Sequence, residues 1–127
     1  MTASAHAREL LQQAAVAADS KAGEDLVALD VSGPLPFTDV FLLVSGNSER
    51  NVVAIADGVE DALLEAGTKL LRREGKEGGR WVLLDFGDLV VHVFHQEDRQ
   101  YYALERLWRD CPVVAFELPD AVETARR

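Results

Sequence analysis

The sequence contains a single cysteine, little positive charge and no long hydrophobic run. Cys111 is the only cysteine among 127 residues, which excludes an internal disulfide and a zinc site built from cysteines. The longest apolar runs, at 40–44 and 52–56, are far shorter than the ~18 residues that indicate a membrane span. The first ten residues lack a basic stretch followed by an apolar core, so no secretory signal is predicted. We therefore expect a soluble, cytoplasmic protein without a membrane partner.

The scarcity of positive charge restricts the class of partner. Thirteen Lys and Arg residues against twenty-two Asp and Glu residues give a formal net charge of −9. Affinity for nucleic acid comes largely from Lys and Arg on phosphates, so we expect no direct, sequence-specific binding of nucleic acid. An acidic surface suits a basic protein partner better, because complementary potentials speed their encounter. Solubility alone explains a negative charge equally well.

Length and composition are those of one globular domain. Hydrophobic residues make up 48% of the chain and charged residues 28%, which is too apolar for a disordered chain. No repeat, low-complexity tract or linker interrupts the sequence. We predict a single domain over residues 1–127, large enough to bury a core without a disulfide or a metal.

Three segments have the periodicity of helices. Residues 4–21 carry a loose apolar stripe and precede Gly23. A second helix is capped by Asn47 or Ser48 and followed by Gly67, a usual residue for a left-handed cap. Residues 97–109 predict a third helix that stops at Cys111-Pro112, because the residue before proline resists helical geometry. The second helix has the clearest buried face: Val52, Ile55, Ala56, Val59, Leu63 and Ala66.

Five segments are predicted to be strands: 26–31, 39–45, 69–73, 81–86 and 89–95. The second is almost continuously apolar, as expected for a strand covered on both faces. Gly87-Asp88 between the last two favours a type II′ hairpin, which fixes their register. Residues 113–116 either add a short strand or pack as coil. The hairpin register places six side chains on one face: Trp81, Leu83, Asp85, Val90, His92 and Phe94.

Asp85 and His92 are the first candidates for acid–base chemistry, because the register makes them diagonal neighbours. No nucleophile motif accompanies them, and Cys111 lies beside a proline. His92 and His95 are three apart in a strand, so they face opposite sides and do not share a metal ion. We predict no catalytic site, no metal and no cofactor. A polar pair within a sheet face, or a recognition surface, is the simpler interpretation.

The segment Ser45-Gly46-Asn47-Ser48 joins a strand to a helix, which is how nucleotidyltransferases hold a phosphate on exposed helix amides. Those enzymes also need carboxylates that hold Mg²⁺, typically on the next strand. The third predicted strand instead reads Lys69-Leu70-Leu71-Arg72-Arg73. A helix cap is therefore favoured. A divergent enzyme that binds nucleotide with Mg²⁺ is the alternative.

Four residues form an aromatic set: Trp81, Tyr101, Tyr102 and Trp108. Core packing is the simpler interpretation for Tyr101 and Trp108, whereas Trp81 and Tyr102 suit an interface. Trp81 starts a strand beside a glycine turn, a position that is often half exposed, and aromatic residues near charges are typical interface anchors. Arg99 and Glu105 flank Tyr102 at helical spacing. These three either complete such a patch or form a solvated face.

Several motifs, in this order, resemble the ribosomal silencing factor family, also called the Iojap family. The resemblance runs from Glu24 to Asp110. It rests on Asp-Leu-Val-Ala-Leu-Asp-Val (25–31), Thr38-Asp39, Ser-Gly-Asn-Ser-Glu-Arg (45–50), Ala-Ile-Ala-Asp (54–57) and Glu74-Gly75. The most specific motifs are Trp-Val-Leu-Leu-Asp-Phe-Gly-Asp-Leu-Val-Val-His-Val-Phe (81–94) and Arg-Gln-Tyr-Tyr-Ala-Leu-Glu-Arg-Leu-Trp (99–108). Val40 and Asn51 depart from the aromatic and the glutamine common in the family.

The resemblance implies an α/β fold with a mixed β-sheet flanked by helices, like nucleotidyltransferases but without their catalytic carboxylates. It also implies a function by binding. The family docks on large-subunit ribosomal protein fourteen, blocks association of the subunits sterically and represses translation when nutrients are scarce. A role in assembly of the large subunit is the alternative. Family members also form homodimers, so a homodimer of the free chain is a further possible state.

We expect the hairpin to supply the docking surface for the ribosomal protein. Trp81 would be the anchor. Asp85, Asp88 and Glu105 would meet basic side chains, while His92 and Tyr102 would donate hydrogen bonds. Asp39 and Arg50 could equally be structural, holding a strand end and a helix start.

Overall fold

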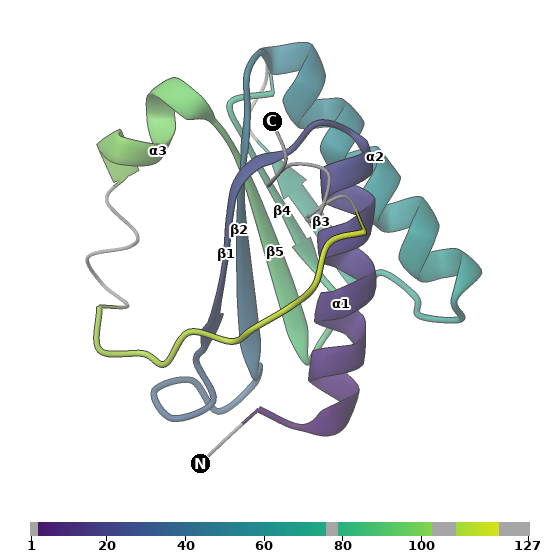
Figure 1. The fold of residues 1–127 in the computed structure, drawn as a ribbon, viewed down its shortest axis with the longest axis vertical. Coiled ribbons are helices and arrows are strands. Elements are labelled where there is room, and N and C mark those ends of the chain that lie inside the picture. The colour runs from purple at the N-terminus through teal and green to yellow at the C-terminus, as the bar shows by residue number, and fades with distance from the viewer. Residues whose placement is uncertain (1–2, 76–78, 103–108, 120–127) are drawn as a thin grey trace.

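The computed structural model describes residues 3–75, 79–102 and 109–119 (Figure 1). These residues contain three helices and five strands. The order is α1 (Ala5–Ser20), β1 (Glu24–Asp30), β2 (Val40–Gly46), α2 (Glu49–Glu65), β3 (Arg72–Gly75), β4 (Trp81–Asp85), β5 (Leu89–His95) and α3 (Gln96–Tyr102).

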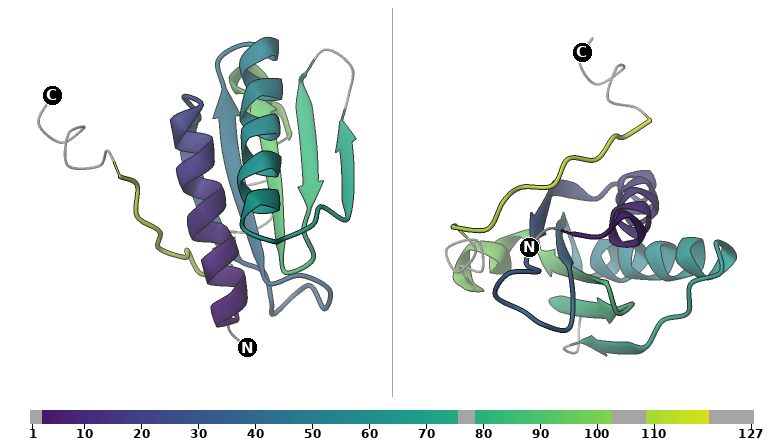
Figure 2. Two further views of the ribbon diagram at one scale, coloured as in Figure 1. Left: turned by 90° about the vertical axis from the view of Figure 1, so that its right-hand side faces the viewer. Right: turned by 90° about the horizontal axis from the view of Figure 1, so that it is seen from below.

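The strands form one five-stranded sheet in the order β1-β2-β5-β4-β3. The β2–β5 pair is parallel and the other three pairs are antiparallel. Helices α1 and α2 pack side by side on one face of the sheet, whereas α3 lies on the other side (Figures 1 and 2). The predicted mixed-sheet α/β fold is therefore confirmed.

The core has two parts because the sheet is buried on both faces. The larger part lies between the sheet and the two long helices, where Leu42 and Leu84 meet Leu11 and Ile55. The smaller part lies on the opposite face and contains Leu29, Val31, Phe41, Leu43, Val90 and Phe94. All seven residues of β2 are buried, as its continuous apolar run predicts.

The hairpin has the predicted register. Trp81 pairs with Phe94 and Leu83 with His92, so position sums are constant along β4 and β5. The Phe86 N–H donates to the Leu89 carbonyl at 2.9 Å, and Gly87 has φ +93°, a conformation that glycine adopts without strain. The six side chains predicted to share a face therefore do so.

The third strand differs from the prediction. The sequence predicts residues 69–73, but β3 covers Arg72–Gly75 and pairs with β4 from Asp85 to Val82. Leu70 packs against the core rather than entering the ladder. The aliphatic residues 70–71 therefore led to a wrong prediction of the strand's bounds, because pairing with β4 outweighs local strand propensity.

The C-terminal part of the chain lies along β1. Val113 makes an isolated bridge with Leu29, and the Val114 N–H donates to the Ala28 carbonyl at 2.9 Å. Of the two outcomes left open for 113–116, the segment is coil with one bridge rather than a strand. The predicted third helix begins at Gln96, and its residues 103–108 lie outside the described residues.

Within the described parts of the chain, no helix is both long enough and apolar enough to cross a membrane. The same residues contain no group of three His, Cys, Asp or Glu side chains arranged to hold a metal ion.

Candidate functional site

The structure places four of the six predicted site residues on or beside one side of the β4–β5 hairpin. We call Trp81, Leu83, Asp85, Val90, His92 and Phe94 the hairpin face; it lies opposite α1 and α2. Asp88 lies in the turn that joins the two strands. Tyr102 is the last residue of α3, with a side chain that is not described, and Glu105 lies outside the described residues.

Trp81 is held in place by aromatic neighbours and is half-buried. Its ring centroid lies 5.2 Å from that of Phe94, with the planes 30° apart. Its indole Nε1–H donates to His92 Nδ1 at 3.4 Å. Because the ring is half-buried and fixed on two sides, it would lose little conformational freedom on binding a partner.

His92 is buried, although it shares the hairpin face with the half-buried Trp81. Its side chain is 5% exposed and meets Phe41 edge-on, with ring centroids 4.8 Å apart. Burial lowers the pKa of His92 to about 4, so the ring is neutral at pH 7. Since Nδ1 accepts from Trp81, the proton of the neutral ring is assigned to Nε2. Contact between His92 and a partner stays a prediction.

Asp85 and Asp88 form an acidic end to the hairpin. One Asp85 oxygen accepts the Gly87 N–H at 2.9 Å, which stabilises the turn. Asp85 also lies directly across from Arg72 of β3. The Asp88 carbonyl accepts the N–H groups of Asp39 and Val40, both at 3.1 Å, and so joins the turn to the start of β2. Both residues are half-buried.

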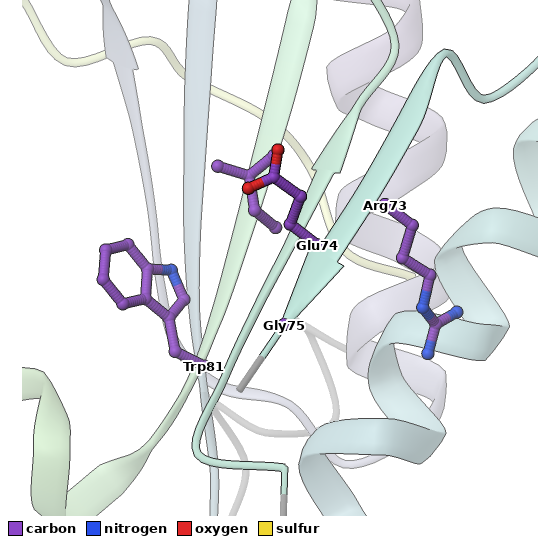
Figure 3. Close-up of a pocket in the computed structure, with 5 residues that line it drawn as sticks. Arg73, Glu74, Gly75 and Trp81 are labelled. Carbon is purple, nitrogen blue, oxygen red and sulfur yellow. The ribbon is translucent and has the colours of Figure 1, made fainter. Parts of the chain in front are cut away.

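A hollow of about 580 Å³ adjoins Trp81, lined by Arg73, Glu74, Gly75, Trp81 and Leu83 (Figure 3). The Arg73 side chain points away from it toward α2, where its guanidinium meets Asp57 and Glu60 at 2.8 Å each. The Glu74 carboxylate lies on the side of the sheet that carries Trp81. The sequence motif includes Glu74, but only the displaced strand β3 brings it beside Trp81.

Two arginines fix α3 beside this surface. Arg80 makes a bidentate contact with Asp98, at 2.8 and 2.9 Å, and reaches Glu97 at 3.3 Å. Arg99 donates to the Ser45 hydroxyl at 2.8 Å and to the Asp25 carbonyl. The sequence analysis left an interface patch or a solvated face open for Arg99, whereas the structure shows that Arg99 links α3 to the ends of β1 and β2. The sequence analysis missed Arg80, whose only signal is the pair of acidic residues in the first turn of α3.

The segment Ser45-Gly46-Asn47-Ser48 forms a helix cap. Ser48 Oγ accepts the Asn51 N–H at 3.0 Å, and Asn51 Oδ1 accepts the Asn47 N–H at 2.9 Å. A Cβ on Gly46 would lie 2.7 Å from the Val52 side chain, so close packing accounts for the glycine. These contacts favour the cap over a phosphate site.

We expect Ser48→Ala to lower the free energy of unfolding by about 1 kcal/mol, because it leaves the Asn51 N–H without its acceptor. Chemical denaturation followed by circular dichroism measures this change. Ser48→Asp keeps an acceptor and is the control. An unchanged stability in Ser48→Ala would mean that the cap contributes nothing to α2.

Asp39 has the structural role that was one of its two interpretations. Its Oδ2 accepts the Ser4 N–H at 2.8 Å, just before α1 begins. It therefore joins the start of β2 to the first helix, on the side of the molecule where the hairpin turn lies.

Comparison with known proteins gives consistent matches. The family model described as "Ribosomal silencing factor during starvation" matches residues 4–127. The ribosomal silencing factor of Halalkalibacterium halodurans is 49% identical over 110 residues, covering 87% of this chain and 94% of that protein. A crystal structure of a Chromobacterium violaceum protein superposes with a TM-score of 0.76 at 39% identity, covering 79% of this chain and 83% of that one.

A more distant mouse relative is named "Mitochondrial assembly of ribosomal large subunit protein 1". It is 30% identical over 87 residues, which cover 66% of this chain and 38% of that protein.

Proposed function

The chain belongs to the ribosomal silencing factor family, and from this premise we propose that it represses translation by binding the large ribosomal subunit. In this proposal it docks on large-subunit ribosomal protein fourteen. It then blocks the approach of the small subunit sterically. It acts in the cytoplasm, without catalysis or a cofactor.

One observation carries the choice of docking surface. The hairpin face presents a preformed, half-buried Trp81, and the hairpin turn next to this face carries Asp88. Interface anchors are typically aromatic residues surrounded by charged ones. A net charge of −9 favours contact with a basic ribosomal protein and disfavours contact with the surrounding RNA, which gives selectivity for the protein.

The proposed docking surface therefore consists of the six residues named in the sequence analysis. Trp81 would be the anchor, and His92 would support it from beneath. Asp85 and Asp88 would meet basic side chains at the turn. Tyr102 and Glu105 would extend the surface from the third helix. Stable placement of α3 by Arg80 and Arg99 supports this last part.

A sucrose-gradient experiment tests the proposal. The chain is added to purified large subunits before small subunits, and the fraction of complete ribosomes is measured. We expect comigration with the large subunit and a dose-dependent loss of complete ribosomes. Absence of comigration would contradict the proposal, whereas comigration without loss of joining would replace silencing by assembly.

Assembly of the large subunit is the second candidate, supported by the name of the mouse relative. In the assembly proposal the chain docks on the same ribosomal protein as in the silencing proposal, but it binds while the large subunit is being assembled. A homodimer of the free chain is compatible with both. If the dimer used the hairpin face, self-association would compete with ribosome binding, and sedimentation of a hairpin-face variant would reveal this.

A further inference from the structure

We propose that the hollow beside Trp81 binds one basic side chain of the partner, an arginine or a lysine, with Glu74 as its counter-ion. This inference rests on the proposed function and assigns chemistry to one part of the docking surface. It adds Glu74, which the sequence analysis does not place in the site.

The hollow is large enough to admit an inserted side chain. Its volume of about 580 Å³ lies within the range of small-ligand sites, roughly 300–1,000 Å³. Trp81 and Leu83 provide an apolar wall, and both are half-buried. An inserted side chain could therefore bury its aliphatic stem there, as long basic side chains do.

The charges select a cation. Among the described lining residues Glu74 supplies the carboxylate, and it lies on the same side of the sheet as Trp81 (Figure 3). Among the described lining residues the cation is Arg73, which is turned toward α2 and neutralised by Asp57 and Glu60. A cation in the hollow would meet both the Glu74 carboxylate and the face of an indole, which attracts cations through its quadrupole.

The existing partner of Glu74 does not prevent this. Arg72 Nε contacts Glu74 Oε2 at 2.8 Å, but the two side chains are 60% and 57% exposed. An ion pair this exposed contributes little to stability, because water screens it. A partner cation that becomes buried at the interface would gain more from the carboxylate, because water is excluded around it. Arg72 also has Asp85 opposite it as a second carboxylate.

Binding of purified large subunits by five variants tests the inference: Glu74→Gln, Asp61→Asn, Trp81→Leu and two double variants. We expect Glu74→Gln to weaken binding about fivefold or more, since it removes the counter-ion of a buried cation. Asp61→Asn is the matched control: it removes one exposed carboxylate from α2, on the other side of the sheet, and should leave binding within twofold. Circular dichroism verifies that each variant is folded.

The double variant Glu74→Gln/Trp81→Leu distinguishes one partner cation that contacts both side chains from a general effect of charge. If one cation contacts both side chains, the double variant loses less affinity than the product of the two single losses. The combination of Asp61→Asn with Trp81→Leu should instead be multiplicative.

Each outcome decides between two claims. Failure of the unaltered chain to bind large subunits overturns the proposed function and this inference together. Binding by the unaltered chain with an equal affinity for Glu74→Gln overturns the inference alone and indicates an apolar guest. Tighter binding by Glu74→Gln also overturns it, because Glu74 would then face phosphate. Multiplicative losses of affinity in Glu74→Gln/Trp81→Leu would contradict the claim that one cation contacts both side chains.

Discussion

Replacing Trp81 with alanine is expected to weaken binding to the large ribosomal subunit tenfold or more, a loss above the ~1 kcal/mol that marks an interface hot spot. The physical reason is the arrangement of the ring. Phe94 and His92 fix the indole before binding, so the exposed part of it can be buried without a large loss of rotamer freedom. Alanine would leave an unfilled space where the partner closes over the hairpin face.

Two controls make this result interpretable. Leu64→Ala truncates an exposed apolar side chain on α2, on the opposite side of the sheet, and should not change binding. Trp81→Phe keeps an aromatic ring but loses the Nε1–H that donates to His92, so an intermediate loss is expected. Thermal unfolding verifies that the variants are folded. A folded Trp81→Ala chain with unchanged affinity would remove Trp81 from the docking surface.

Replacing Asp30 with alanine is expected to lower the free energy of unfolding by about 3 kcal/mol, because several buried donors would lose their acceptor at once. Asp30 is 6% exposed at the end of β1. Its carboxylate accepts the Ala3 N–H at 2.8 Å, and from Ser32 both the N–H at 3.0 Å and the hydroxyl at 2.6 Å. One side chain thus joins the residues before α1 to the loop after β1.

Chemical denaturation measures the loss, and Ser32→Ala serves as the matched control. That variant removes the hydroxyl donor but keeps the carboxylate and both backbone contacts, so about 1 kcal/mol is expected. An equal loss in the two variants would mean that the backbone contacts of Asp30 contribute nothing.

The same carboxylate predicts a dependence of stability on pH. Burial by itself would raise the pKa of Asp30, but hydrogen bonds from Ser32 and Ala3 outweigh it and hold the pKa below its ordinary value. The ionised form therefore stabilises the fold above the ordinary aspartate pKa of about 4, and this stabilisation is lost as the pH falls through the lowered value. The stability difference between the unaltered chain and Asp30→Asn should be constant from pH 5 to 8 and shrink below about pH 4.

The sequence by itself determined the elements whose signals are local. The helical stripe of residues 52–66 predicted α2, and a cap at Asn47 or Ser48 marked its start; the structure places the cap at Ser48. The Gly87-Asp88 turn fixed the hairpin register, because a two-residue loop leaves only one pairing and alternation then assigns every side chain to a face. The sequence alone therefore places Trp81, Asp85 and His92 on a common face.

The depth of those side chains was decided by the tertiary structure. Alternation places His92 on the hairpin face, but only the parallel pairing of β5 with β2 brings Phe41 against it and buries it. That burial makes His92 a neutral support for Trp81. The alternation of side chains along β5 does not reveal which residues of a strand distant in sequence will lie against them.

The hollow next to Trp81 also depended on long-range pairing. The aliphatic residues 70–71 predicted a strand that ends at Arg73, whereas pairing with β4 moves it to Arg72–Gly75 and so places Glu74 opposite Leu83. Strand propensity describes how well a residue fits a half-buried pleated surface, and that surface exists only once the neighbouring strand is in place. For this protein, local chemistry in the sequence determined the hairpin and its aromatic and acidic residues, and the assembled sheet determined which of them are buried, which are exposed and which carboxylate lies beside the tryptophan.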